Sequence, residues 1–193
     1  MPLSQHTPRL LCFVGLHGVG KSTIAKAAAR TACGIHISVG DLCRAARRGK
    51  VPEGWPVRLI AAFARHAPGS VLADETAELL LEFVSRIVRK DYMVFIDGFP
   101  SSVGHIDVLE SNDTLRGKFR IVMVECDDEL RKARLLRRAS ETGRKWRQDM
   151  DATERDLGVA QVVDVAMQRS LLKHVRNDGG PDGLDDVVAK VLS

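Results

Sequence analysis

A glycine-rich stretch near the N-terminus limits most strongly what this chain folds into. Residues 15–23 read Gly-Leu-His-Gly-Val-Gly-Lys-Ser-Thr, a glycine and four residues followed by Gly-Lys-Ser. An apolar run at 10–14 precedes the stretch, and an alanine-rich segment of good helix formers at 24–30 follows it. This order predicts a strand, a phosphate-binding loop and a helix. The alternative interpretation is an ordinary glycine turn between a strand and a helix.

The backbone of such a loop explains its chemistry. Glycines let successive N–H groups point into one hollow, and the N-terminus of the next helix adds partial positive charge. We expect Lys21 to reach the β- and γ-phosphates of a nucleotide and the Ser22 hydroxyl to ligate Mg²⁺. His17 is expected to contribute through its backbone. The predicted ATP contacts are Gly15, His17, Gly18, Val19, Gly20, Lys21, Ser22 and Thr23.

Length and composition are those of an ordinary globular protein. The 193 residues are 45% hydrophobic and 28% charged, which favours one domain over residues 1–193. The net charge is +4 without an isolated polybasic block, so no nucleic-acid partner is expected. The four cysteines have no zinc-type spacing, and no apolar run approaches membrane-spanning length. We therefore expect a cytoplasmic protein without a membrane partner, and favour a monomer.

Strand-like and helix-like segments alternate along the chain. Short apolar or β-branched runs at 35–39, 92–97, 120–126 and 174–176 follow the first strand. The segments between them have helical character, and the sequence predicts helices over 41–48, 55–67, a long stretch capped by Asp74, 127–140, 151–172 and 184–192. Such alternation predicts an α/β fold of three layers, with about five parallel strands covered by helices on both faces.

An acidic residue ends one of the expected strands. Asp97 closes the apolar run at 92–97, and ligands in parallel α/β sheets bind at the carboxyl ends of strands. This position favours a carboxylate that meets Mg²⁺ near the phosphate loop, together with Ser22. A turn or helix-capping aspartate is the alternative.

Arginines repeat along the helix that follows the next strand. Arg134 and Arg138 are four residues apart, and Arg131 lies one turn earlier. Guanidinium groups suit a transferring phosphoryl group because they form bidentate contacts with its oxygens. A solvated basic helix face is the alternative.

Four segments together resemble the adenylate kinase family, the nucleoside monophosphate kinases. They are residues 15–23, Ser-Val-Gly-Asp-Leu-Cys-Arg-Ala-Ala at 38–46, Asp-Gly-Phe-Pro at 97–100, and Arg134-x-x-x-Arg138. The resemblance covers most of the chain. It implies transfer of the γ-phosphoryl group from Mg·ATP to the phosphate of a nucleoside monophosphate.

The resemblance also implies roles for individual residues. Residues 41–74 form the acceptor-binding segment, and a short lid spans approximately 139–150. Arg134 contacts ATP, and Arg138 contacts the transferring phosphoryl group. The implied catalytic set is Lys21, Arg134, Arg138, Arg144 and Arg147. The implied acceptor-binding set is Val39, Gly40, Asp41, Arg44, Val71, Leu72, Gly98, Ser101, His105 and Arg155.

Departures from the family pattern gather on the acceptor side. Family members have threonine, arginine and glutamine where this chain has Val39, Ser101 and His105. The leading hypothesis is a nucleoside monophosphate kinase whose acceptor nucleotide need not be AMP. A second hypothesis is a kinase for a nucleoside or another small-metabolite hydroxyl, with His105 or Asp41 receiving the proton. A third is a nucleotide-binding regulator that has lost phosphoryl transfer.

Overall fold

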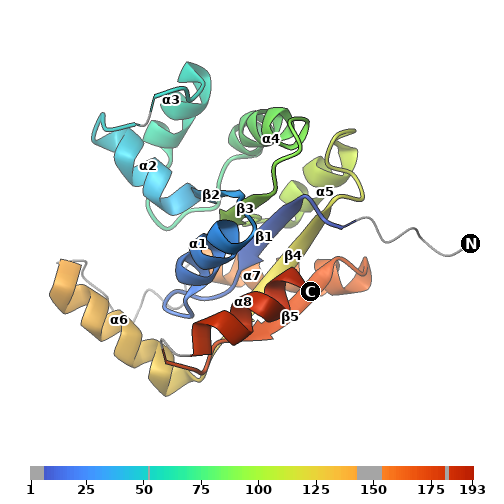
Figure 1. The fold of residues 1–193 in the computed structure, drawn as a ribbon. Helices are drawn as coiled ribbons and strands as arrows, with labels where there is room; N and C mark the ends of the chain where they lie inside the picture. Colours follow the sequence, from blue (N-terminus) through green and yellow to red (C-terminus); the bar gives the residue numbers. More distant parts are fainter. Residues whose placement is uncertain (1–6, 52, 143–153, 181–182) are drawn as a thin grey trace, which may run out of the picture.

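The computed structural model describes residues 7–51, 53–142, 154–180 and 183–193, and its ribbon is shown in Figure 1. A five-stranded parallel sheet lies at its centre, in the strand order β2-β3-β1-β4-β5. The strands are β1 (Leu10–Val14), β2 (Ile35–Ser38), β3 (Val94–Asp97), β4 (Phe119–Glu125) and β5 (Leu172–Arg176). The α/β fold predicted from the alternating segments is confirmed.

Helices connect the strands and cover both faces of the sheet (Figure 1). They are α1 (Lys21–Thr31), α2 (Val39–Arg47), α3 (Val57–Arg65), α4 (Asp74–Val88), α5 (Val103–Ser111), α6 (Asp128–Thr142), α7 (Glu154–Gln168) and α8 (Leu184–Leu192). Of the helices in the described ranges, none is long and apolar enough to cross a lipid bilayer.

Two apolar cores separate because neighbouring residues of a strand point to opposite faces. Leu10 and Cys12 of β1 join the core beneath α4, α5 and α7. Leu11 and Phe13 join the other core, beneath α1 and α8. All five residues of β1 are buried, as expected for a parallel strand covered on both sides.

Most predicted elements are present, with boundaries shifted by a few residues. Helix α2 begins two residues earlier than predicted, because the Ser38 hydroxyl accepts the Asp41 N–H and caps the helix. Asp74 does not cap α4 as predicted; it is the first helical residue, after Ala73. The larger, C-terminal part of the predicted lid, 143–150, lies outside the described residues.

The fold brings the predicted motifs to one end of the sheet. The loop after β1 and the ends of β2 and β3 are adjacent because these strands pair in register. The α2–α3 unit and helix α6 extend on opposite sides of α1 (Figure 1). The start of α1, where this loop ends, therefore lies between the α2–α3 unit and the arginine-bearing helix α6.

Candidate active site at the carboxyl ends of the strands

The loop at 15–20 is pressed against two other parts of the chain. Gly18 has φ +90°, and a Cβ atom there would lie 2.8 Å from Cγ of Leu135 on α6. Gly20 precedes α1 with φ +97°, and a Cβ atom there would lie 2.3 Å from Nδ2 of Asn177, just after β5. Both the left-handed backbone and the close approach require glycine.

Side chains from these neighbours bind the outward-facing carbonyl groups of the loop. Arg131 Nη1 donates to the His17 oxygen at 3.4 Å. The Val19 oxygen accepts from Asn177 Nδ2 at 2.8 Å and from Arg134 Nη1 at 3.5 Å. Since the N–H and C=O of one peptide point in opposite directions, these contacts turn the following N–H groups toward the hollow of the loop.

The loop N–H groups are available to a ligand. Within the described part of the chain, the N–H groups of Gly18, Val19 and Gly20 donate to no protein acceptor. Lys21 folds over the same loop, and its Nζ donates to the Gly15 and Leu16 oxygens at 2.6 Å each. These donors converge at the N-terminus of α1, which is a natural place for an anion.

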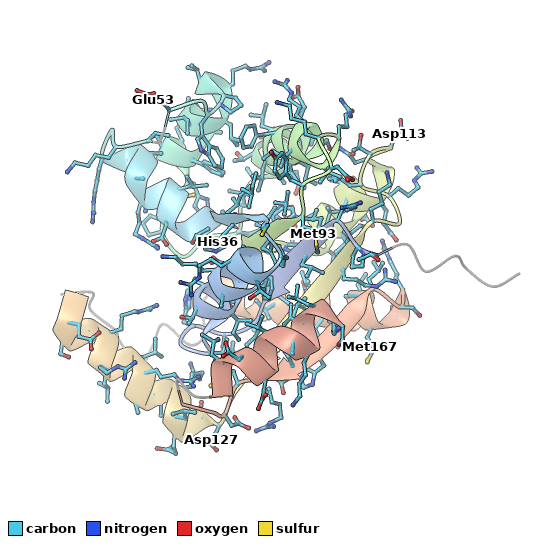
Figure 2. All side chains as sticks on the ribbon, viewed as in Figure 1. His36, Glu53, Met93, Asp113, Asp127 and Met167 are labelled. Carbon is cyan, nitrogen blue, oxygen red and sulfur yellow. The ribbon has the colours of Figure 1, made fainter. Side chains whose placement is uncertain are left out.

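Asp97 is the hub of the polar groups beneath the loop. It is only 5% exposed, and its Oδ1 accepts from the Ser22 hydroxyl at 2.9 Å and the Ser38 hydroxyl at 3.3 Å. Its Oδ2 lies 2.7 Å from Nε2 of His36, which projects from β2 beside α1 (Figure 2). Side chains from two elements, α1 and β2, therefore fix the carboxylate next to the first residues of α1.

The oxygen donors at this place suit Mg²⁺. Hydroxyl and carboxylate oxygens are hard ligands, and Mg²⁺ is bound in kinases by one or two protein groups together with phosphate oxygens. Among the described residues, no group of three or more His, Cys, Asp or Glu side chains forms a dedicated metal cage. Ser22 and Asp97 thus fit an ion that arrives with a nucleotide.

Helix α2 exposes an arginine that is paired with a carboxylate. Arg44 forms an ion pair with Asp41, one turn earlier on α2. Its side chain is 37% exposed and that of Asp41 is 60% exposed, so both are open to solvent. Val39, at the start of the helix, is buried in the core and offers no polar group.

Ser101 and His105 hold the backbone of Leu72 from both sides; we call this arrangement the Leu72 clamp. The Ser101 hydroxyl accepts the Leu72 N–H at 3.2 Å, and His105 Nε2 lies 3.0 Å from the Leu72 oxygen. The Ser101 N–H donates to His105 Nδ1 at 3.1 Å, which places the imidazole proton on Nε2. The imidazole also stacks on the Phe99 ring, with centroids 4.9 Å apart.

Burial keeps His105 neutral. Its side chain has no exposed surface, and burial lowers its pKa, against the opposing influence of the Leu72 carbonyl and the Asp74 carboxylate. Both ring nitrogens are hydrogen-bonded, so neither is open to a substrate proton in this conformation.

For most of the remaining predicted residues, the structure gives a position in the fold. Val71 and Gly98 lie beside Leu72 and Asp97 in the chain, at the same end of the sheet. Arg138 lies on the exposed surface of α6, one turn beyond Arg134. Arg155 lies in α7, although its side chain is not described. Arg144 and Arg147 lie outside the described residues.

Two site residues had not been singled out in the sequence. His36 points to the same side of β2 as Ser38, and the alternation of a strand was the signal that placed them together. Asn177 follows the weakest strand pattern, in a turn-rich segment, and no local signal marks its contact with Val19, which is distant in sequence. Ser38 is part of the motif at 38–46, but the motif does not predict its hydrogen bond to Asp97.

Together, the phosphate loop, the carboxylate at the end of β3 and the arginines of α6 define a P-loop kinase. A family model described as an AAA domain matches residues 14–155. The adenylate kinase of Cyanothece sp. is 31% identical over 71% of this chain and 68% of that protein. The chain therefore belongs to the adenylate kinase family.

Other relatives match over different lengths. Adenylate kinase 1 of Nostoc sp. is 29% identical over 87% of this chain and 90% of its own length. The match to the adenylate kinase of Borrelia turicatae, 31% identical, covers 52% of this chain and 46% of that protein. A gluconokinase structure from Sinorhizobium meliloti has a TM-score of 0.59 and 15% identity, covering 97% of this chain and 91% of that one. At that identity the likeness concerns the fold.

Proposed function

We propose that the chain transfers the γ-phosphoryl group of ATP to the phosphate of a nucleoside monophosphate. The observation that carries this proposal is the 2.9 Å contact between Ser22 and Asp97, directly beneath the phosphate loop. A loop alone indicates that a nucleotide is bound. A hydroxyl and a buried carboxylate beside it supply the oxygen pair from which a phosphotransferase holds its metal ion.

On the donor side, each polar group has an assigned task. The N–H groups of Gly18, Val19 and Gly20 hold phosphate oxygens, and the remaining loop residues from Gly15 to Thr23 shape their cradle. Lys21 leaves the Gly15 and Leu16 carbonyls to bind the β- and γ-phosphates. Mg²⁺, held through Ser22 and Asp97, neutralises charge on those phosphates when it is bound. In-line transfer then depends on positioning and on charge stabilisation.

Arginines complete the charge stabilisation in this proposal. Arg134 already contacts the loop, with Nη1 on the Val19 oxygen and Nη2 on the Gly179 oxygen at 2.9 Å. Its place between the loop and the segment after β5 supports a contact with ATP. Arg138, with Arg144 or Arg147 from the lid, would reach the transferring group as the lid excludes water.

On the acceptor side, Arg44 is the proposed ligand of the acceptor phosphate. Asp41 keeps its guanidinium oriented on α2. Gly40, Val71 and the backbone at Leu72 and Gly98 would border the acceptor, and Arg155 would approach from α7. Val39, Ser101 and His105 belong to this wall as buried structural residues.

The Leu72 clamp also supports a second candidate, a kinase whose acceptor is a small metabolite with a hydroxyl group. Ser101 and His105 form hydrogen bonds within the protein. Fewer side chains would therefore be available to recognise the base of a nucleotide. Because both nitrogens of His105 are engaged, Asp41 is the better proton acceptor in this version.

An acceptor panel with Mg·ATP separates the candidates. ADP formation is measured with each nucleoside monophosphate, each nucleoside and a set of sugars and sugar acids that includes gluconate. The proposal expects one or more nucleoside monophosphates to exceed every hydroxyl acceptor in kcat/KM. Higher turnover of a hydroxyl acceptor would establish the second candidate. ATP binding without turnover of any acceptor would indicate the regulator.

We further propose that residues 1–193 act as one kinase domain, monomeric and cytoplasmic. Size-exclusion chromatography with light scattering at working concentration should give the mass of a single chain, 21.2 kDa. A mass twice as large would contradict the monomer.

A further inference from the structure

A cavity lies on the side of α1 that faces α2, along the free edge of the sheet. Strand β2 is an edge strand, and a cavity of about 760 Å³ runs beside it between α1 and α2. The residues that line it include Ser22 and His36, from α1 and β2, and Lys50 and Trp55, from the segment after α2. We call this cavity the β2 groove.

Three cations face the β2 groove from two directions. Ser22, Lys26 and Arg30 are spaced four residues apart on α1, so they form one stripe along the helix. Lys50 faces them from the segment after α2. Among the described residues, no carboxylate forms an ion pair with the side chains of these three cations. Some surface cations elsewhere do have such partners; Lys132, for example, pairs with Asp128 at 2.9 Å.

The acidic residue on the groove wall does not offset this charge. Asp41 lines the cavity, but its carboxylate is engaged by Arg44. The groove therefore holds an excess of positive charge within a concave surface, where field lines concentrate and anions are attracted.

The groove also has apolar lining residues. These are Ile35 of β2, Leu42 and Ala45 of α2, and Trp55. The Trp55 ring is held by Phe83, with centroids 4.6 Å apart. A volume of this size, lined by apolar side chains and a few charged groups, has the character of a small-molecule site.

We propose that the β2 groove binds a small metabolite that carries two or more anionic groups on a compact apolar or ring-shaped body. The anionic groups, phosphate or carboxylate, lie against Lys26, Arg30 and Lys50, and the body lies against Ala45 and Trp55. The groove borders the proposed metal and acceptor sites, because Ser22 and Asp41 line it. The residues that would contact the metabolite, Lys26, Arg30, Ala45, Lys50 and Trp55, are not among the proposed ATP, metal or acceptor contacts.

Trp55 provides the measurement. The chain has two tryptophans, so the Trp146→Phe variant leaves Trp55 as the single tryptophan emitter. This variant, with its phosphate loop filled by Mg²⁺ and a non-hydrolysable ATP analogue, is titrated with fructose 1,6-bisphosphate and with tricarballylate. The two probes distinguish phosphate from carboxylate recognition. Calorimetry in the same solutions detects binding that leaves the emission unchanged. We expect saturable binding of at least one probe, with a Kd on the order of 0.1–1 mM.

Matched variants locate the binding. K26Q/R30Q/K50Q removes the groove cations and should weaken binding at least ~30-fold, because each contact is charge-assisted. R86Q/K90Q removes two cations from a different cavity, of about 440 Å³, which Trp55 also lines. That control should change the Kd less than about twofold. Unchanged thermal unfolding of both variants shows that the fold is intact.

Three results would overturn the proposal. One is no binding of either probe by fluorescence and by calorimetry. Another is a loss of binding that follows R86Q/K90Q instead of the groove variant. The third is tighter binding of a poly-aspartate peptide than of both small probes, which would make the groove a protein-docking surface.

Discussion

The two sides of the candidate site use their polar groups differently. On the donor side, Arg131, Arg134 and Asn177 bind carbonyl groups of the loop and leave its N–H groups facing outward to a ligand. On the proposed acceptor side, Ser101 and His105 bind the N–H and the carbonyl of Leu72, and both residues are buried. Similar hydrogen bonds thus leave the loop N–H groups open to a ligand and occupy the backbone groups of Leu72.

Under the proposed function, such a difference would let a family fold change its acceptor while it keeps its phosphate cradle. A phosphate cradle depends on backbone groups, which only glycines and a few supporting side chains can arrange. An acceptor site depends on side chains, and each is replaced without disturbing the sheet. In this chain the replaced positions, Ser101 and His105, have become structural. We therefore expect mutations to affect catalysis on the donor side and stability on the acceptor side.

Removal of the loop lysine should have the largest effect. Lys21→Ala deletes the cation that meets the β- and γ-phosphates, and loss of one such stabilising group lowers kcat about 10²–10³-fold. The measurement is steady-state ADP release with the best acceptor of the panel. Lys118→Ala, at an exposed turn, is the matched control and should keep full activity. Phosphoryl transfer by Lys21→Ala within tenfold of the parent would contradict the assigned role.

Loss of the Leu72 clamp should lower stability. His105→Ala leaves the Leu72 oxygen and the Ser101 N–H buried without partners, and it opens a cavity beside Phe99. Together these changes should lower the free energy of unfolding by about 2–4 kcal/mol, measured by urea denaturation. Ser111→Ala, at the exposed end of α5, should change it by less than about 0.5 kcal/mol. A full-stability variant with lost acceptor affinity would instead make His105 a ligand-binding residue.

The sequence could predict the donor side in more detail than the acceptor side. The motif at 15–23 follows a strand and begins a helix, so neighbouring residues are enough to predict the shape of the phosphate loop. The fold class followed from alternating apolar runs for the same reason. The Leu72 clamp joins residues about thirty positions apart, and no spacing rule encodes such a contact. The motif indicated that Ser101 and His105 were unusual, but only the packing of α4 and α5 showed what they touch.

One variant on each side of the site should have an effect of intermediate size. Asn177→Ala removes the 2.8 Å hydrogen bond to the Val19 oxygen, so the loop loses part of its preorganisation. We expect ATP affinity to fall about tenfold, near 1.4 kcal/mol. Ser101→Ala removes the acceptor of the Leu72 N–H and should lower stability by about 1–2 kcal/mol without changing ATP affinity. Calorimetry and urea denaturation of both variants provide the test. An equal loss of ATP affinity in the two variants would show that the sides are coupled.

The smallest expected effect is a pH dependence that belongs to the acceptor side. Burial lowers the pKa of His105 below its ordinary value of 6.5. As pH falls below 6.5, the unfolded chain binds a proton at this residue while the folded chain does not, so stability falls. The loss has a slope of up to about 1.4 kcal/mol per pH unit, and it ends at the lower pKa of the folded state. Above pH 7 the contribution is absent.

His105→Gln isolates this contribution from those of the other histidines. Glutamine does not titrate, so the difference in unfolding free energy between parent and variant should shrink as pH falls from 7 to 5. His174 is the matched control, because it is about half exposed and pairs with Glu125 at the carboxyl end of β4, on the β4–β5 edge of the sheet. His174→Gln should leave the acid-side slope of His105 in place. A parent-minus-variant difference that stays constant across this range would show that His105 takes up a proton in the folded state. The clamp would then open in acid, and the acceptor side would gain the polar group that it lacks at neutral pH.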